Sequence, residues 1–399
     1  MRLSVIPWLF TCACGMASPR GPTFPTNQPI STTPARDLAE AKSLATKIAS
    51  TDGADKLVVK DPRVNLDIIK ITATQRGVGG ELELTSESTG ELFRQAGDLV
   101  AQKRTLAAMA LYKKLVADYP ESNLAPISLF NIAALYDAQG NPDDTVATLR
   151  LLVKTYPESH ESIEGHLFIA ALFSEKNRFA EADTVLDEVL ARTNLTYGDR
   201  IEAFARKGYG LLQQKRYPAA QAALDSAISE WHKVPHLDDA YYIAMAHYYR
   251  GEVAHQKFID APIRHDDDLM IADLEAKREL AVAAYDMWKE SLGFKHAYWA
   301  TAAGYQMSQI FVELWKATVQ APFPKKLAPD ARDQYVAEVH RRMREHLEKA
   351  LEGHRMNVEL AKAYGVVTEW SQGSAARATE VLELLSKDAA GKFVSPPQS

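Results

Sequence analysis

A fixed spacing of small residues dominates the middle of this 399-residue chain. Small side chains recur at intervals of 37, 37 and 38 residues, at Ala108, Thr145, Ala182 and Ala220. A bulky residue follows four positions after each, at Tyr112, Leu149, Leu186 and Leu224. A period of about 20 to 50 residues is the signature of an architecture in which each unit buries its apolar face against its neighbours. The stretch from residue 92 to 224 therefore predicts four tandem helical hairpins.

This pattern resembles the tetratricopeptide repeat. Counted back from Pro157, the second unit carries the family's small and bulky positions in register, at Leu129, Ala133, Tyr136, Thr145, Leu149 and Leu152. The units are three or four residues longer than the family's usual 34 or so, and the third and fourth lack the proline. The small positions have a physical reason, because helices cross closely only where side chains are short. The resemblance implies an all-α solenoid of helical hairpins wound into a right-handed superhelix.

In this family, one face of each first helix lines a concave groove that binds partners. The matching positions that we predict to contact a partner are Phe93, Ile127, Phe130, Asn131, Asp137, Leu167, Tyr209 and Leu212. The implied groove is apolar and aromatic with an acidic edge, which suits an amphipathic helix or an extended peptide. The family's clamp of Lys, Asn and Arg on a C-terminal carboxylate would need the positions of Phe93, Gly97, Asn131, Glu164 and Phe168. Only Asn131 matches, so we do not expect this clamp.

Residues 1–17 are predicted to be an export signal. Arg2 precedes a short apolar core at residues 3–10, and Ala13 stands directly before Cys14. The arrangement resembles a bacterial lipobox, which implies that Cys14 is lipidated. Cys12 fits less well, because the residue before it is Thr11.

Lipidation would anchor the protein in a membrane. Each buried methylene contributes about 0.8 kcal/mol, and stable anchoring needs more than one acyl chain. Gly15 follows the cysteine, which by resemblance to known sorting rules favours the periplasmic side of the outer membrane. Two alternatives stay open: cleavage after Ala17 to give a soluble periplasmic protein, and an unprocessed cytosolic tail.

The rest of the chain divides by composition. Residues 18–36 are rich in Pro, Ser and Thr and are predicted to be a disordered tether. Residues 37–88 hold the end of a predicted helix at 35–50 and a β-branched run, which we interpret as either a small β-hairpin or irregular chain. The four repeats occupy residues 89–235, and divergent repeats with capping helices occupy residues 236–386. A disordered tail is predicted for residues 387–399.

Composition and motifs exclude several functions. The net charge of -6 provides no basic surface, so nucleic acid is not an expected partner. The sequence contains no phosphate-binding loop, zinc-protease helix or nucleophile elbow, so we expect no catalytic residue, cofactor or metal. The His-Asp-Asp-Asp run at 265–268 is interpreted as the cap of a helix that starts near Leu269, with a metal site as the alternative. His340, His346 and His354 are predicted at the surface of one charged helix.

The sequence as a whole indicates a non-enzymatic scaffold that holds other proteins at a bacterial cell envelope. The Tyr-Pro-Glu-Ser segments at 119–122 and 156–159 resemble envelope repeat proteins. Residues 363–366 with Glu369 and Trp370 resemble the ends of repeat lipoproteins from predatory and gliding bacteria. These resemblances imply a role in envelope biogenesis or gliding motility machinery. Two alternatives are a periplasmic receptor that binds a small ligand or peptidoglycan fragment through aromatic residues of the second half, and an enzyme.

Overall fold

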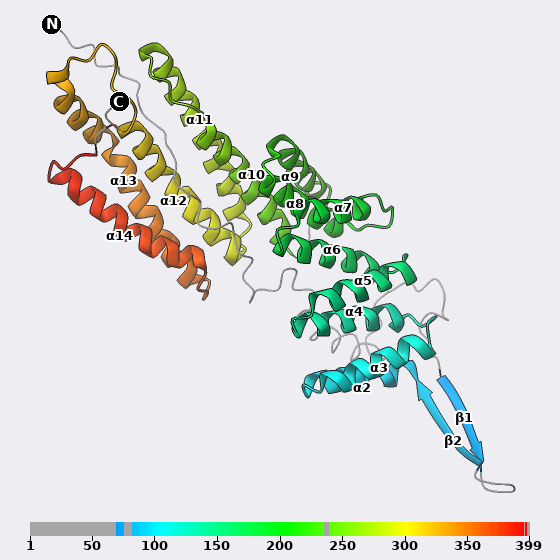
Figure 1. Ribbon diagram of the computed structural model, residues 1–399. Coiled ribbons are helices and arrows are strands. Elements are labelled where there is room, and N and C mark those ends of the chain that lie inside the picture. Colours follow the sequence, from blue (N-terminus) through cyan, green and yellow to red (C-terminus); the bar gives the residue numbers. More distant parts are fainter. Residues whose placement is uncertain (1–68, 76–81, 235–238, 395, 397–399) are drawn as a thin grey trace. The chain divides into compact units, whose positions relative to one another are not determined.

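The computed structural model describes residues 69–75, 82–234, 239–394 and 396. Within these ranges a two-stranded hairpin is followed by thirteen α-helices in consecutive hairpin pairs (Figure 1). The predicted all-α helical-hairpin fold is therefore confirmed. The helices form two compact units that part between Leu195 and Thr196, whereas the repeat pattern suggested a division after residue 235. The predicted signal with Cys12 and Cys14, the tether and the helix at 35–50 lie outside the described residues.

A small antiparallel β-hairpin precedes the helices, which confirms one of the two interpretations of this segment. β1 (Ile69–Gln75) pairs with β2 (Leu82–Ser88). A two-stranded hairpin is only marginally stable by itself. The Glu87 carboxylate accepts hydrogen bonds from the Lys114 ammonium and, at 3.1 Å, from the Tyr119 hydroxyl. These bonds fasten β2 to the first helical pair.

Three helical hairpins complete the unit that ends at Leu195. They consist of α2 (Thr89–Ala101), α3 (Thr105–Asp118), α4 (Leu124–Ala138), α5 (Pro142–Thr155), α6 (His160–Glu175) and α7 (Phe179–Leu190). Each helix packs against the next in sequence, and the first helices α2, α4 and α6 also contact one another in order. The small repeat positions Ala108, Thr145 and Ala182 are buried. They are the points where short side chains let the helices pack closely.

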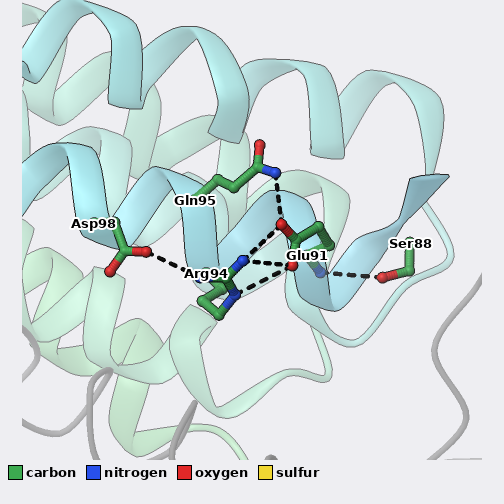
Figure 2. A network of polar contacts seen from close by, with 5 residues as sticks. All are labelled: Ser88, Glu91, Arg94, Gln95 and Asp98. Atoms are coloured by element: carbon green, nitrogen blue, oxygen red, sulfur yellow. Dashed lines mark hydrogen bonds and ion pairs between the residues drawn. The ribbon is translucent and has the colours of Figure 1, made fainter.

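The first repeat begins at a capped helix end. The Ser88 side-chain oxygen accepts a hydrogen bond from the Glu91 backbone N–H at 3.1 Å. The Glu91 carboxylate accepts from Arg94 and from Gln95, each at 2.6 Å, and Arg94 also donates to Asp98 (Figure 2). A cap of this type stabilises a helix by about 1 kcal/mol. The ion pairs are about half exposed, so solvent screens them and they add little to stability.

The same short turn joins the two helices of each of the first four hairpins. Its middle residue has a positive φ angle, at Lys103 (59°), Gly140 (73°), Asn177 (57°) and Lys215 (58°). A left-handed backbone crowds Cβ against the following carbonyl oxygen, except in glycine. The repeat therefore imposes a backbone conformation that Gly140 adopts without strain, that Asn177 tolerates, and that is strained at Lys103 and Lys215.

We expect Gly140→Lys to lower the free energy of unfolding of the first unit by about 1 kcal/mol, since a side chain in this conformation costs about 1 to 2 kcal/mol. Lys103→Gly at the matching turn should have the opposite sign. Its gain should be smaller, because glycine also makes the unfolded chain more flexible. Urea unfolding of both variants measures the effect. Changes of the same sign would contradict this account of the turn.

The second unit continues with longer helices. They are α8 (Tyr197–Gln213), α9 (Tyr217–Trp231), α10 (Tyr241–Asp260), α11 (Asp267–Gly293), α12 (Ala297–Val319), α13 (Arg332–Ala363) and α14 (Glu369–Ala389), with a short 3-10 turn, η2 (Pro329–Ala331), before α13. The first helices α8, α10, α12 and α14 again contact one another in order. None of the described helices is long and apolar enough to cross a membrane.

A glycine fixes the close packing of α8 on α9. A Cβ built on Gly208 would lie 2.4 Å from Leu224 Cγ, whereas one built on Gly97 in α2 meets no atom within 4 Å. Leu224 is one of the bulky repeat positions identified in the sequence, and Gly208 packs against it from α8. The packing explains why a residue that weakens helices stands inside α8.

Gly208→Ala should destabilise its unit by about 1 to 3 kcal/mol, because the methyl group forces Leu224 out of its place. Gly97→Ala is the matched control, and it should stabilise the other unit by about 0.5 to 1 kcal/mol, since alanine favours a helix interior. Thermal unfolding followed by circular dichroism compares the two. Equal effects would show that helix propensity, not packing, determines the stability change at Gly208.

The three histidines of α13 are buried, so the prediction that they lie at the surface was wrong. Their spacing of six and eight residues does place them on different faces. However, α13 packs against both α12 and α14, and both faces are therefore covered. His340 lies 2.7 Å from the Asp388 carboxylate and 2.9 Å from the Val394 carbonyl oxygen. The tail that the sequence analysis expected to be disordered begins at residue 387, but α14 continues to Ala389. Val394 packs against a hydrophobic cluster of α12, α13 and α14.

Candidate partner-binding surfaces

In the first unit, the predicted groove residues divide into buried and half-buried groups. Phe93, Phe130 and Leu167 are buried, and Phe130 is only 2% exposed. The Phe93 ring packs edge-on against Tyr112 at 5.5 Å, and the Phe130 ring lies 6.2 Å from Phe168. These aromatic residues hold the helices together, so contact with a partner stays a prediction for them.

The half-buried group is Ile127, Asn131 and Asp137, all on α4. Burial raises the pKa of the Tyr112 hydroxyl to about 12. The hydrogen bond to the Asn131 side chain acts in the opposite direction and lowers this pKa. Burial also raises the pKa of Asp137, although the charge of Lys176, directly after α6, opposes this. The first helices of this unit therefore offer an apolar, an amide and an acidic side chain along α4. These three are the predicted groove residues that a partner can reach in the first unit.

In the second unit, both predicted groove residues are buried. Tyr209 and Leu212 lie on α8, and the Tyr209 ring lies 4.7 Å from the Tyr249 ring of α10. Burial raises the pKa of Tyr209 well above its usual range. The contact between the Tyr209 and Tyr249 rings joins the neighbouring first helices α8 and α10, and both rings are buried.

Polar bridges that the sequence analysis did not identify join the first helices of this unit. Between α8 and α10, the Arg206 guanidinium donates to the Glu202 carboxylate and to the Tyr242 hydroxyl, both at 2.7 Å. Arg206 and Glu202 side chains are only 6% and 14% exposed. The four-residue spacing of Glu202 and Arg206 signals a helical ion pair, but no sequence signal indicates Tyr242 as the third member.

Two further bridges join α10 to α12. Gln306 donates to the Glu252 carboxylate at 2.9 Å, and His255 Nε2 lies 2.6 Å from Glu313. Burial raises the pKa of Glu252. Burial alone would lower the pKa of His255, but the charge of Glu313 and its hydrogen bond outweigh burial and raise it. Of these two bridges, only the one between His255 and Glu313 joins two ionisable groups, because Gln306 is neutral.

The aromatic residues of the second half form a packed cluster. Tyr248, Tyr249 and Trp299 are each 2% exposed or less, and Trp299 lies 5.3 Å and 5.6 Å from the two tyrosine rings. The Trp370 ring of α14 joins the cluster 6.0 Å from Tyr248. Rings that fill one another's contact surface are part of the core. The arrangement does not favour the small-ligand receptor.

The acidic run at 265–268 caps a helix, as the sequence predicted. The Asp266 side chain accepts from the Leu269 backbone N–H at 3.3 Å, and Asp267 accepts from the Lys325 backbone N–H at 2.7 Å. His265 Nε2 lies 3.1 Å from the Phe323 carbonyl oxygen. Among the residues that the structure describes, no group of three or more His, Cys, Asp or Glu side chains is placed to hold a metal ion.

Two stretches of the chain match a known family. Residues 92–122 and 128–159 match the tetratricopeptide repeat, and they correspond to the hairpins α2–α3 and α4–α5. The match covers these two hairpins and no other part of the chain. The matched repeats and the hairpin fold support a function as a protein–protein interaction scaffold. Folds of this kind are generally non-catalytic.

The chain is also similar to solved structures of low sequence identity. A tetratricopeptide repeat protein from Parabacteroides merdae is 14% identical over 75% of this chain and 98% of its own, with a TM-score of 0.34. The C-terminal part of a repeat-containing protein from Cytophaga hutchinsonii is 12% identical over 75% and 98%, with a TM-score of 0.38. MamA from Desulfovibrio magneticus RS-1 is 12% identical over 51% and 96%, with a TM-score of 0.34. None of the curated proteins compared with the chain matches it.

Proposed function

We propose that this protein is a non-enzymatic scaffold of a bacterial cell envelope, which holds other envelope proteins in an assembly that serves envelope biogenesis or gliding motility. The observation that carries the proposal is the pair of tetratricopeptide repeats at 92–159, with α2, α4 and α6 side by side. A row of parallel first helices presents a continuous surface on which a peptide or helix can lie.

The envelope location rests on the N-terminal sequence. Cys14 follows Ala13 after a short apolar core, and three acyl chains on this cysteine would hold the scaffold on the periplasmic side of the outer membrane. A soluble periplasmic protein is the alternative if the signal is cleaved after Ala17. In both cases the repeats would face other proteins of the periplasm.

Partner binding is tested by a double variant on α4, Ile127→Glu with Asp137→Lys. Both positions are half-buried, so the change alters the surface of the first helices with less damage to the core than a change at Phe130. We expect recovery of cross-linked envelope proteins to fall at least about tenfold, because a few central contacts contribute most of the binding energy of an interface. The matched control is Leu106→Glu on α3, where the side chain is 78% exposed.

Two results would reject this binding surface. One is equal recovery with the α4 variant and the wild-type protein. The other is an equal loss with Leu106→Glu, because that residue lies on a second helix. Circular dichroism should show the same helix content for all three proteins.

The anchor is tested by the intact mass of the mature protein and by Cys14→Ser. We expect a triacylated N-terminus that starts at Cys14, and release of the variant into the soluble fraction. A mature wild-type protein that retains Met1 and an unmodified Cys14 would end the lipoprotein proposal. The binding test above does not depend on this outcome.

A further inference from the structure

The chain turns back on itself directly after α14. Gly391 has a positive φ of 70°, and the Lys392 backbone N–H donates to the Lys387 carbonyl oxygen at 2.9 Å. In this arrangement a glycine in the left-handed conformation ends a helix and redirects the chain. Phe393 and Val394 therefore come to lie against α13. We call residues 391–394 the strap.

The strap is held by His340 of α13. The Nδ1 atom of His340 lies 2.7 Å from Asp388 Oδ1, and its Nε2 atom lies 2.9 Å from the Val394 carbonyl oxygen. The Phe393 ring lies 4.8 Å from the imidazole, and the Trp315 ring of α12 packs edge-on against it at 5.6 Å. The side chains of His340 and Asp388 are only 1% and 7% exposed. The two hydrogen bonds are therefore shielded from water.

Both nitrogens of this imidazole face hydrogen-bond acceptors. A carbonyl oxygen can only accept, and so can an ionised carboxylate. A neutral imidazole carries one N–H and can satisfy one of them, whereas an imidazolium donates to both. A shift of the proton from His340 to Asp388 would leave the total number of protons the same. The strap contact thus holds one proton more than a neutral histidine beside an ionised aspartate.

Loss of that proton would leave a buried acceptor without a donor. Asp388 Oδ2 is buried and has no hydrogen-bond partner among the residues that the structure describes, so the carboxylate depends on His340. An unsatisfied buried polar group destabilises the contact that contains it.

Asp388 is the one charged group that contacts this imidazole within the described ranges. α12 meets the imidazole through the uncharged Trp315 ring, and the strap meets it through the Phe393 ring and the Val394 carbonyl group. The other charged residues nearby on α13, α14 and the strap are accessible to solvent: Glu338, Arg341, Arg344, Lys387 and Lys392. Solvent screens these charges, so the paired His340 and Asp388 dominate the response to pH.

We propose that the contact is a pH-sensitive latch, in which a proton shared by His340 and Asp388 fastens the strap to α13 and its loss at higher pH releases the strap. The sign follows from linkage, because the fastened strap binds one proton more than the released strap. The ratio of fastened to released strap can therefore fall by up to about tenfold per pH unit. Histidines exchange protons between about pH 5 and 8, so this is the range to examine. Release would also remove Val394 from the hydrophobic cluster of α12, α13 and α14.

The latch is tested on the full-length protein with 4-fluorophenylalanine incorporated at Phe393. Fluorine NMR should show the ring of the fastened strap at pH 5.5, and at least a tenfold rise in the ratio of released to fastened strap by pH 8.5. Asp388→Asn is the decisive variant. Its amide can donate to Nδ1 of a neutral imidazole, whose Nε2–H still donates to Val394. This variant should stay fastened and lose the response to pH.

Arg341→Gln is the matched control, because it removes a neighbouring charge that is 68% exposed and should leave the pH response as in the wild-type protein. The imidazole nitrogen shifts of His340 should change over the same pH range as the fluorine signal. Both titrations are measured on the wild-type protein, so the test does not depend on the folding of a variant. The latch is rejected if the fluorine signal is independent of pH, if it changes where His340 does not titrate, or if Asp388→Asn responds to pH like the wild type. Loss of the response in Arg341→Gln would reject it as well.

Discussion

Replacing Trp288 by alanine should lower the free energy of unfolding of the second unit by about 3 to 5 kcal/mol, the range found when large buried rings are removed. Trp288 is fully buried in α11, and its ring lies 5.4 Å from the His255 ring of α10. Its indole N–H has no hydrogen-bond partner. The loss is therefore one of packing alone, because no polar group loses its partner.

The matched control on the same helix is Val282→Ala. Val282 is 49% exposed, so its truncation should change stability by less than about 0.5 kcal/mol. Urea unfolding followed by far-ultraviolet circular dichroism avoids the loss of tryptophan fluorescence. If Trp288→Ala cost less than about 1 kcal/mol, α10 and α11 would not be packed around this ring as described.

Acid should destabilise the second unit between about pH 6.5 and pH 4, because two buried histidines hold their neutral forms. Burial lowers the pKa of His354 to about 4, and the charge of Arg377 adds to this. Burial lowers the pKa of His247 to about 4 as well, and the charge of Arg250 again adds to it. Both values lie below the usual value of 6.5 in an unfolded chain. The unfolded state therefore binds protons first as the pH falls.

The sign follows from linkage. The stability that these residues contribute is complete above the unfolded pKa and is lost as the pH falls toward the folded pKa. One pKa unit corresponds to about 1.4 kcal/mol, so each histidine contributes at most roughly 3 kcal/mol. His255 acts in the opposite direction, because Glu313 raises its pKa and protonation favours the folded state.

Urea unfolding at pH 7, 5.5 and 4.5 measures this dependence. We expect His354→Gln to make the stability of the second unit less dependent on pH, even if the variant is less stable at pH 7. Val367→Ala, at a position of the same unit that is 79% exposed, should leave the dependence unchanged, because it removes no titratable group. An unchanged pH dependence in His354→Gln would show that His354 is not the group that titrates.

The repeat spacing predicted the fold because it records packing. Ala108, Thr145, Ala182 and Ala220 are buried in the structure, and the bulky residues after them fill the space around them. The helix cap at Asp266, before α11, was also predicted, since caps depend on neighbouring residues only. Local and periodic signals of this kind can be interpreted without the tertiary structure.

The candidate surfaces were harder to predict, because the same apolar pattern describes a core and a groove. Phe130 and Tyr209 stand at positions that line the groove in the family, but here they are buried against neighbouring helices. The bridge from Arg206 to Tyr242 joins residues 36 positions apart, and the burial of His340 depends on the packing of α12 and α14 around α13. These features arise only when helices from different hairpins meet.

The most direct test of the scaffold is cross-linking in intact membranes, followed by detergent extraction and mass spectrometry of the isolated assembly. The account predicts stoichiometric recovery of one or more envelope proteins, with cross-links on α2, α4 and α6. A well-folded protein that recovers nothing above background, and that instead binds a peptidoglycan fragment tightly without protein partners, would contradict it.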